Sequence, residues 1–323
     1  MTTNSLSDKR VLVTGGAGFI GSHLVEAIAA IEPASLIVAD TFFIGKREHL
    51  EASEELYPAL VIAEVDTADR EALERLVAAH PVDVVFDLAT LPLPYSLDEP
   101  YDTVVKITAM AVNLAELARI GAFGTLVHFS TSEVYGSAVT IPMDESHPIV
   151  PQTPYAAAKA SADHTVAAYI ETFGIDAVIV RPFNNYGPRQ NEGAYAALIP
   201  IAIRAAAAGE PMTVFGTGEQ TRDFMYVGDT VAGTLAIFDS IETRGQAVNL
   251  ATGTETSVND VVATVYDLMG IELSVDRADA RPADVQQHCG SSALAASLTG
   301  FKAETSLRDG LARTIDWYRE FVL

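Results

Sequence analysis

The chain has 323 residues, 49% of them hydrophobic, and a formal charge of −23. Its length suits one large domain or one domain with a smaller lobe, and its acidity argues against nucleic acid as a partner, because phosphate backbones are bound by basic surfaces. No stretch reaches the roughly 18 uncharged apolar residues of a membrane helix, and the polar N-terminus does not resemble a signal peptide, so we expect a cytoplasmic protein that does not bind membranes.

Apolar runs of strand length alternate with longer helical patterns through the first half of the chain. We predict strands at residues 10–14, 35–40, 60–65, 82–88, 125–130 and 177–180, and helices at residues 21–30, 68–80, 104–120 and 155–173. Strands that are apolar throughout and alternate with helices are typical of a parallel sheet whose two faces are both covered. The sequence therefore predicts an α/β fold.

The alternation weakens after about residue 182. Pro188, Pro200 and Pro211 interrupt it, and helical patterns return only at residues 258–269 and 306–321. Proline lacks a backbone donor and is disfavoured in the middle of a helix or strand. We expect residues 1–182 to form the main domain, and residues 183–323 to form mainly a smaller lobe that is interleaved with the last strands of the sheet.

A glycine-rich loop joins the first predicted strand to the first predicted helix, with the sequence Thr14-Gly-Gly-Ala-Gly-Phe-Ile-Gly21. Glycines let the backbone turn tightly and approach a pyrophosphate, and the helix N-terminus offers free N–H groups. Glycines at this spacing often form an ordinary turn that binds no ligand. Here the order of strand, loop, helix and second strand favours a dinucleotide-binding site. We predict contacts to the cofactor from Gly15, Gly18, Phe19, Ile20 and Gly21.

Acidic residues end the second and third predicted strands. Asp40 lies 19 residues after Gly21, the interval at which an acid binds the adenosine ribose, and its carboxylate would repel a 2′-phosphate, so NAD is favoured over NADP. Asp66 and Thr67 are expected at the adenine, although an ordinary helix N-cap is the alternative. The predicted cofactor-binding set is completed at the end of the fourth strand by Leu88 and Ala89.

Tyr155 and Lys159 are four residues apart on a predicted helix and therefore share one face. A lysine ammonium and a positive nicotinamide would lower the pKa of the phenol, so the phenolate can take a proton from a hydroxyl while hydride leaves. The spacing alone is common, and its weight comes from its place downstream of the dinucleotide loop. No cysteine or histidine cluster has metal-ligand spacing, so we expect no metal.

The fifth predicted strand runs into Ser130-Thr-Ser-Glu-Val-Tyr-Gly136. Ligands of such sheets bind at the carboxyl ends of the strands. Thr131 can bind the same substrate hydroxyl as Tyr155, and Glu133 can reach the neighbouring carbon of the substrate. Ser132 lies between them and is a further catalytic candidate. The alternative is that Thr131 and Ser132 only cap the strand end while Glu133 is solvated.

These motifs resemble the extended short-chain dehydrogenases of the nucleotide-sugar epimerase/dehydratase family. Three further segments match in the same order, namely Arg181-Pro-Phe-Asn-Asn-Tyr-Gly-Pro-Arg189, Arg222-Asp-Phe-Met-Tyr-Val-Gly-Asp229 and Arg281-Pro-Ala-Asp284. The resemblance covers essentially the whole chain. It implies a Rossmann-type doubly wound sheet with a smaller C-terminal substrate-binding lobe, NAD, a nucleotide-diphosphate sugar as substrate, and a homodimer formed through a four-helix bundle of helices 104–120 and 155–173.

The resemblance also assigns residues to the substrate. It places Asn184 at the sugar-nucleotide phosphate, Arg222 and Arg281 at the diphosphate, and Asn249 at a further contact. The planar guanidinium of arginine suits phosphate oxygens, and surface salt bridges are the alternative. Segments similar to dehydratases of N-acetylated amino sugars add three expected substrate-binding residues, Tyr95, Ser96 and Arg189.

The family's common first step is oxidation at C4, after which the ketone acidifies the C5 proton. Simple 4-epimerases usually carry a small or neutral residue where Glu133 stands, so Glu133 favours a 4,6-dehydratase acting on a hexose like that of UDP-N-acetylglucosamine. Ser132 departs from the acid of the commonest dehydratases. A UDP-glucuronate decarboxylase is the second candidate function, and it is less favoured because His288 or a neighbour stands where the resemblance leads us to expect an arginine.

A UDP-sugar 4-epimerase is the third candidate. The alternative from a different functional class is a non-catalytic regulator that binds NAD(H).

Overall fold

The computed structural model describes residues 6–280 and 285–323. Its centre is a seven-stranded sheet in the order β11-β6-β5-β4-β1-β2-β3, and every neighbouring pair is parallel. The strands are β1 (Arg10–Thr14), β2 (Ser35–Asp40), β3 (Val61–Glu64), β4 (Val84–Asp87), β5 (Thr125–Phe129), β6 (Asp176–Pro182) and β11 (Ala247–Leu250). The strand order reverses between β1 and β4, so the predicted doubly wound parallel sheet is confirmed.

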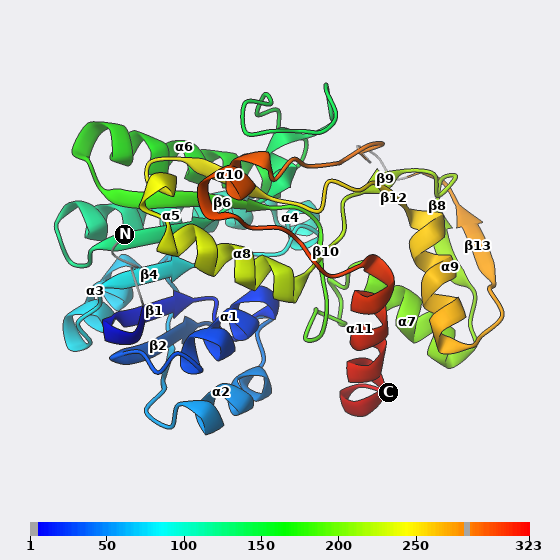
Figure 1. The fold of residues 1–323 in the computed structure, drawn as a ribbon, viewed down its shortest axis with the longest axis horizontal. Helices are drawn as coiled ribbons and strands as arrows, with labels where there is room; N and C mark the ends of the chain where they lie inside the picture. Colours follow the sequence, from blue (N-terminus) through cyan, green and yellow to red (C-terminus); the bar gives the residue numbers. More distant parts are fainter. Residues whose placement is uncertain (1–5, 281–284) are drawn as a thin grey trace.

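Helices cover both faces of this sheet (Figure 1). Successive strand residues point to opposite faces, so Val11 and Val13 of β1 pack in one apolar cluster while Leu12 packs in another. The first cluster includes α1 (Phe19–Ala29), α8 (Val227–Asp239) and α10 (Ala293–Thr299). The second includes α3 (Arg70–Ala79), α5 (Pro100–Arg119) and α6 (Pro154–Phe173).

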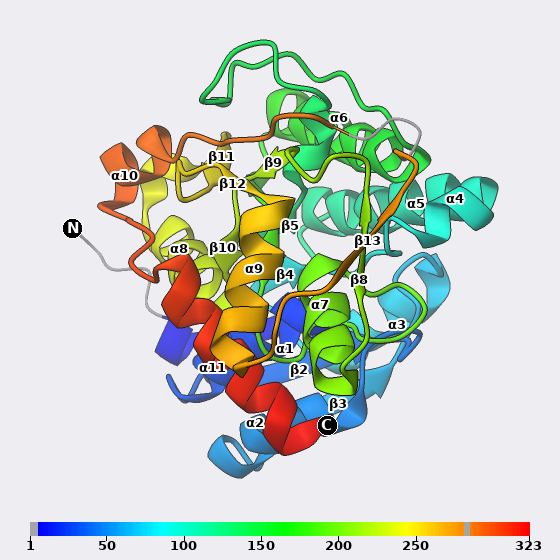
Figure 2. The ribbon, with the colours of Figure 1, turned by 90° about the vertical axis from the view of Figure 1, so that its right-hand side faces the viewer.

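A second core lies beyond the carboxyl end of the sheet. It is formed by α7 (Leu198–Ala208), α9 (Val258–Met269), α11 (Leu307–Phe321) and the parallel pair β8 (Met212–Phe215) and β13 (Val275–Ala278). Figure 2 shows α7, α9 and α11 side by side at this end of the molecule. Within the described residues, no helix has the length and apolar character needed to cross a bilayer.

The remaining elements are short. They are the helices α2 (Glu51–Leu56) and α4 (Tyr95–Asp98), the 3-10 helices η1 (Leu6–Asp8), η2 (Arg47–Leu50), η3 (Ser132–Tyr135) and η4 (Ile241–Thr243), and the strands β7 (Asn185–Tyr186), β9 (Thr221–Arg222), β10 (Met225–Tyr226) and β12 (Thr256–Ser257). Two of them, α4 and η3, follow sheet strands at the edge where ligands are expected to bind.

The sequence patterns located the sheet strands and the longer helices of the first half, but they missed the short helices α2 and α4 there and the helices α7, α8 and α10 in the second half. Helix α7 contains Pro200 in its first turn, where the missing N–H has no intrahelical partner in any case. Helix α8 lies against α1 and therefore belongs to the sheet layer although it follows residue 182. Helix α5 begins earlier than predicted because Pro100 opens its first turn.

Candidate functional site

A cavity of about 630 Å3 opens at the carboxyl ends of β1 and β4. This is the point where the strand order reverses, which is the usual ligand site of such sheets. Every residue predicted to bind the cofactor lines this single cavity. Of the predicted site residues, the lining contains Gly15, Gly18, Phe19, Ile20, Gly21, Asp40, Asp66, Thr67, Leu88, Ala89, Tyr95, Tyr155 and Lys159.

The glycine loop leaves no room for side chains. Gly15 has a φ of +64°, and a Cβ there would lie 2.8 Å from the backbone of Leu88 and Ala89. A Cβ on Gly21 would lie 2.1 Å from the carbonyl oxygen of Gly15. No side chain caps α1 at Gly18, so the first N–H groups of the helix are available to an anion. A bare backbone next to a helix N-terminus fits a diphosphate.

Asp40 is held against this loop. Its carboxylate accepts hydrogen bonds from the backbone N–H of Ala17 at 2.9 Å and of Phe42 at 2.8 Å. Burial raises the pKa of Asp40, while hydrogen bonds from Phe42 and Ala17 oppose that effect. The side chain is 8% exposed and faces the cavity, where a carboxylate suits a pair of ribose hydroxyls.

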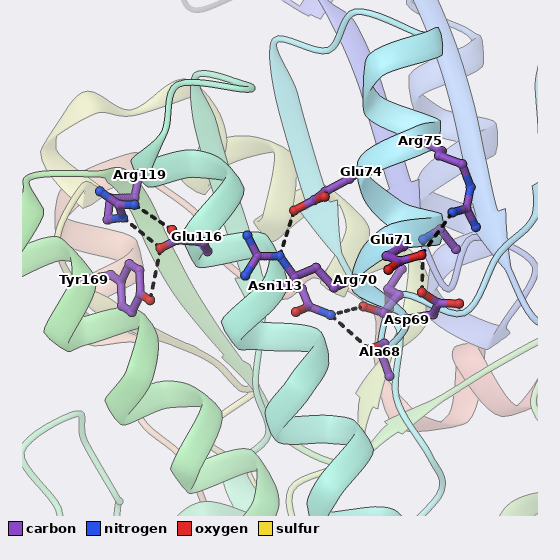
Figure 3. A network of polar contacts seen from close by, with 12 residues as sticks. Ala68, Asp69, Arg70, Glu71, Glu74, Arg75, Asn113, Glu116, Arg119 and Tyr169 are labelled. Atoms are coloured by element: carbon purple, nitrogen blue, oxygen red, sulfur yellow. Dashed lines mark hydrogen bonds and ion pairs between the residues drawn. The ribbon is translucent and has the colours of Figure 1, made fainter.

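The loop after β3 is fixed by a residue that the sequence patterns did not single out. Asn113 of α5 donates to the carbonyl oxygens of Thr67 at 2.9 Å and Ala68 at 3.1 Å (Figure 3). The hydroxyls of Thr67 and of Ser130, two residues that line the cavity, are buried and have no hydrogen-bond partner among the described residues. Buried polar atoms usually have partners, so these two fit a polar ligand that completes them.

Tyr155 stands at the other end of the cavity, in the first turn of α6. Burial and the nearby Glu133 carboxylate raise its pKa to about 12, against hydrogen bonds from Thr131 and Thr90. The pKa of Tyr155 is therefore not lowered by Lys159, although the sequence had led us to expect it. The Lys159 ammonium donates instead to the carbonyl oxygen of Phe129 at 2.5 Å. Thr90 was not predicted as a contact of Tyr155, and it gives the phenol a second hydroxyl neighbour.

The 3-10 helix η3 sets the positions of the three residues predicted after β5. Thr131 caps it by accepting from the N–H of Glu133 at 3.2 Å. Ser132 is buried, and its carbonyl oxygen accepts from Nε2 of His288 at 3.3 Å. Burial and the charge of Arg222 lower the pKa of His288 to about 4, so this histidine is neutral near pH 7.

Two predicted substrate residues lie beside η3 but do not line the cavity. Asn184 is 3.3 Å from Nδ1 of His288, which accepts if Nε2 carries the proton. Arg222 donates to the carbonyl oxygens of Val285 at 2.6 Å and Thr221 at 2.8 Å. His288 thus joins Ser132 to Asn184. The predicted Arg281 lies outside the described residues.

Three other predicted substrate residues have partners within the protein. Asn249 is fully buried and accepts from the hydroxyl of Tyr135 at 2.8 Å. Arg189 pairs with Glu26 of α1 at 2.5 Å. Ser96 is buried and donates to the carbonyl oxygen of Leu93, one turn earlier. In this conformation none of these three lines the cavity.

An aromatic trio that the sequence did not predict as a unit lies at the cavity edge. Tyr95 of α4 is 5.3 Å from Phe43 and 5.8 Å from Tyr195, measured between ring centroids, and all three rings line the cavity. Phe43 is 50% exposed, so the trio lies where the cavity meets solvent. Among the described residues, no group of three or more histidines, cysteines or acids is arranged to hold a metal ion.

Comparison with known proteins gives the same family from sequence and from structure. A family model described as GDP-mannose 4,6 dehydratase matches residues 12–314. UDP-glucose 4-epimerase from Mycolicibacterium smegmatis is 30% identical over 313 residues, which cover 96% of this chain and 98% of the relative. UDP-N-acetyl-alpha-D-glucosaminuronate decarboxylase from Bacillus cytotoxicus is 30% identical over 324 residues, which cover 97% of this chain and 98% of the relative.

A solved structure is similar over the same length. DesIV, a dTDP-glucose 4,6-dehydratase from Streptomyces venezuelae solved with NAD bound, superposes with a TM-score of 0.90 at 31% identity, covering 97% of each chain. The expected cofactor, NAD, is the one found in this neighbour. The three similar proteins are named for three different reactions, so similarity at this level establishes the family and leaves the reaction to the site.

Proposed function

Because the chain belongs to the nucleotide-sugar epimerase/dehydratase family of short-chain dehydrogenases, we propose that it is an NAD-dependent 4,6-dehydratase of a nucleotide-diphosphate hexose resembling UDP-N-acetylglucosamine. The observation that carries this proposal is that Thr131 and Glu133 lie next to Tyr155, which lines one end of the cavity. A hydroxyl-binding group, a carboxylate and a phenol there suit proton removal at two adjacent carbons.

The chain's residues fit NAD along the length of the cavity. The glycine loop would hold its diphosphate, Asp40 its adenosine ribose, and Asp66 and Thr67 its adenine. When bound, NAD supplies the hydride acceptor and a positive charge next to Tyr155. We assign residues 1–182 mainly to this cofactor and the elements after residue 182 mainly to the substrate.

Tyr155 removes the proton of the C4 hydroxyl as hydride leaves C4. Thr131 and Thr90 donate to its oxygen and favour the phenolate, whereas burial and Glu133 disfavour it. Lys159, in the next turn of α6, keeps a cation below the phenol. The result is a ketone at C4, which makes the proton at C5 acidic.

Glu133 then takes the C5 proton, and the C6 hydroxyl leaves as water. Ser132 is a poor acid near neutral pH, so we assign the proton for that hydroxyl to Glu133, which has just acquired one. The hydride taken from C4 then adds to C6, and C5 takes up a proton from solvent in place of the one that left with the water. The proton of the C4 hydroxyl passes from Tyr155 to solvent, so the product has lost one water. For the substrate diphosphate we propose Asn184, Arg222 and Arg281, because arginine forks match phosphate oxygens.

Decarboxylation is the second candidate, favoured by the similarity to a uronate decarboxylase. A substrate carboxylate needs a cation near C5. The resemblance puts His288 or a neighbour where decarboxylases carry an arginine, and His288 is neutral near pH 7 and hydrogen-bonded to Ser132. For this reason we rank decarboxylation below dehydration. Epimerisation at C4 would leave Glu133 without a role in the reaction.

Mass spectrometry on the purified protein with NAD tests the proposal directly. The panel contains UDP-, GDP- and dTDP-sugars, including UDP-N-acetylglucosamine and UDP-glucuronate. We expect a product lighter by one water. Loss of CO2 from UDP-glucuronate would replace dehydration by decarboxylation, an isomer of unchanged mass would mean epimerisation, and silence across the panel would favour a non-catalytic NAD(H)-binding role.

We also propose that the protein is a homodimer formed through α5 and α6. Four exposed apolar side chains share one face of α5 as a stripe, because the last three follow the first by three, four and eleven residues, namely Tyr101, Val104, Val105 and Val112. Helix α5 packs along α6, so a second copy of this helix pair would cover the stripe in a four-helix bundle.

A further inference from the structure

Residues 188–192, here termed the strap, lie between β7 and α7 and lead from the sheet into the second core. The strap lies next to the expected diphosphate site. Phe19, the first residue of α1, lines a small cavity of about 30 Å3 together with Arg189, Gln190 and Asn191 of the strap. Phe19, Gln190 and Asn191 also line the large cavity. A diphosphate bound at the start of α1 would therefore have the strap beside it.

The first half of the strap is bound to α1. Nε2 of His23 is 3.0 Å from the carbonyl oxygen of Pro188. Burial and the charge of Arg189 lower the pKa of His23 to about 4, so the imidazole is neutral near pH 7 and donates this hydrogen bond through Nε2. Glu26, three residues further along α1, accepts from Nη2 of Arg189 at 2.5 Å. The helix that follows the glycine loop thus holds two consecutive strap residues.

The second half of the strap is bound to two other elements. The hydroxyl of Tyr318 in α11 donates to the carbonyl oxygen of Gln190 at 2.9 Å. Glu192 accepts from Nζ of Lys46, in the loop after β2, at 2.7 Å. The strap therefore joins two elements of the cofactor side, α1 and the loop after β2, to a helix of the second core.

Arg189 is the residue of the strap whose conformation is most constrained. Its φ is +63°, in the left-handed region that residues other than glycine rarely adopt. Such a conformation persists where the surrounding contacts fix it. The side chain is only 14% exposed, and a guanidinium taken from water needs a counter-charge. The position of Arg189 therefore depends on its ion pair with Glu26.

We infer that Arg189 is a positioning residue that fixes the strap to α1 through Glu26 and so holds Gln190 and Asn191 against the bound cofactor. Arg189 itself does not line the large cavity, so it acts through the two residues that follow it. The expected consequence is slow release of the cofactor. This inference goes beyond the proposed reaction, because it requires NAD in the cavity and holds for any sugar that is converted.

The test is the rate at which NADH leaves the protein, which needs no sugar. Bound NADH is displaced by excess NAD, and stopped-flow fluorescence gives the dissociation rate. Glu26→Gln keeps the size of the side chain and removes the charge that holds Arg189. We expect NADH dissociation to become about threefold to thirtyfold faster, less than the full effect of a charged hydrogen bond because Glu26 is 37% exposed.

A double-mutant cycle shows whether the two residues act through their contact. Arg189→Met removes the guanidinium and should accelerate NADH dissociation about as much as Glu26→Gln. The double variant should release NADH no faster than the faster single variant, because either change alone already breaks the pair. Arg189→Lys keeps a cation and should give a rate between those of the native protein and Arg189→Met. Effects that multiply in the double variant would overturn the inferred pairing.

Glu74→Gln is the matched control, because it breaks the ion pair between Arg70 and Glu74 on α3, and neither residue lines the cavity. It should release NADH at the native rate. Native rates in folded Glu26→Gln and Arg189→Met would overturn the inference even if the enzyme converts its sugar. Faster release from a protein that converts no nucleotide sugar would support the inference and count against the proposed reaction. If Arg189→Met does not fold, Glu26→Gln, which alters the more exposed partner, still decides.

Discussion

At the scale of single residues, the proposed reaction depends most on Tyr155. We predict that Tyr155→Phe lowers kcat by about 10²–10⁴-fold, the usual contribution of a positioned acid–base group. NAD affinity should stay close to native, because the phenol lies at one end of a cavity whose other residues hold the rest of the cofactor. Stopped-flow turnover and calorimetric NAD binding measure the two effects. A near-normal rate would exclude Tyr155 as the base.

Thr90 provides a finer test of the same phenol. Its hydrogen bond lowers the pKa of Tyr155, so Thr90→Ala should raise that pKa and leave less phenolate at a given pH. We predict that the rising limb of the pH–rate profile moves to higher pH and that the rate on this limb falls about twofold to tenfold, as expected for one hydrogen bond. Thr90→Ser keeps the hydroxyl and should behave as native; an equal loss in both variants would assign the effect to packing.

Residues within one local motif could be predicted from the sequence, whereas residues brought together by the fold could not. The glycine loop and Asp40 lie within a strand–loop–helix–strand unit, and all of their predicted members line the cavity. Asn113 and Thr90 contact segments more than 30 residues away in sequence. No spacing rule connects such residues, because their contacts follow from how helices and strands pack.

At the scale of elements, three segments meet in the aromatic trio of Phe43, Tyr95 and Tyr195. These segments are the loop after β2, the short helix α4 and the loop before α7. Phe43 follows Asp40 by three residues, which places the trio next to the proposed ribose site. Aromatic contacts at the cavity edge therefore join the loop after β2 to the helix α4 and to the loop before α7.

We predict that Phe43→Ala weakens NAD binding about twofold to tenfold, which corresponds to the loss of one or two aromatic contacts. The loss should appear mainly as faster NADH dissociation, measured by stopped-flow fluorescence. Phe321→Ala removes another exposed phenylalanine, at the end of α11, and should leave the dissociation rate unchanged. Equal rates for native protein and Phe43→Ala would mean that the trio does not retain the cofactor.

Element boundaries show why the second half was harder to predict than the first. Apart from the half-buried edge strand β3, the first-half strands are buried on both faces and read as continuous apolar runs. In the second half, short strands such as β9 and β12 have two residues each, too few for a periodic pattern. Helix α8 packs on the sheet although it follows the proline-rich segment, because its apolar residues complete the layer that α1 begins.

At the scale of the whole molecule, the α5 stripe predicts assembly. We expect a dimer by light scattering at micromolar concentration, and we expect Val105→Glu combined with Val112→Glu to give a monomer, since burying two carboxylates in a helix bundle is strongly unfavourable. Val139→Glu places the same charge on a loop residue that is 73% exposed and should leave the dimer intact. A native protein with the mass of one chain would contradict the proposed assembly.

The fold and the family could be predicted from the order of motifs along the chain, while the reaction could not. Dehydration, decarboxylation and epimerisation share the C4 oxidation and differ in where one carboxylate and one proton stand relative to C5 and C6. Such differences are of the order of one ångström. Contacts such as that of His288 with Ser132 carry this information, and they exist only in the folded chain.

Deuterium incorporation during turnover in heavy water tests the proposed dehydration and the role of Glu133 most directly. We predict that the native protein forms a product that has lost one water and carries deuterium at C5. With Glu133→Gln, transient NADH should still form as C4 is oxidised, while deuterium no longer enters C5. Deuterium incorporation at the native rate in Glu133→Gln, or a product of unchanged mass without deuterium, would contradict the assignment of Glu133 as the C5 base and with it the proposed dehydration.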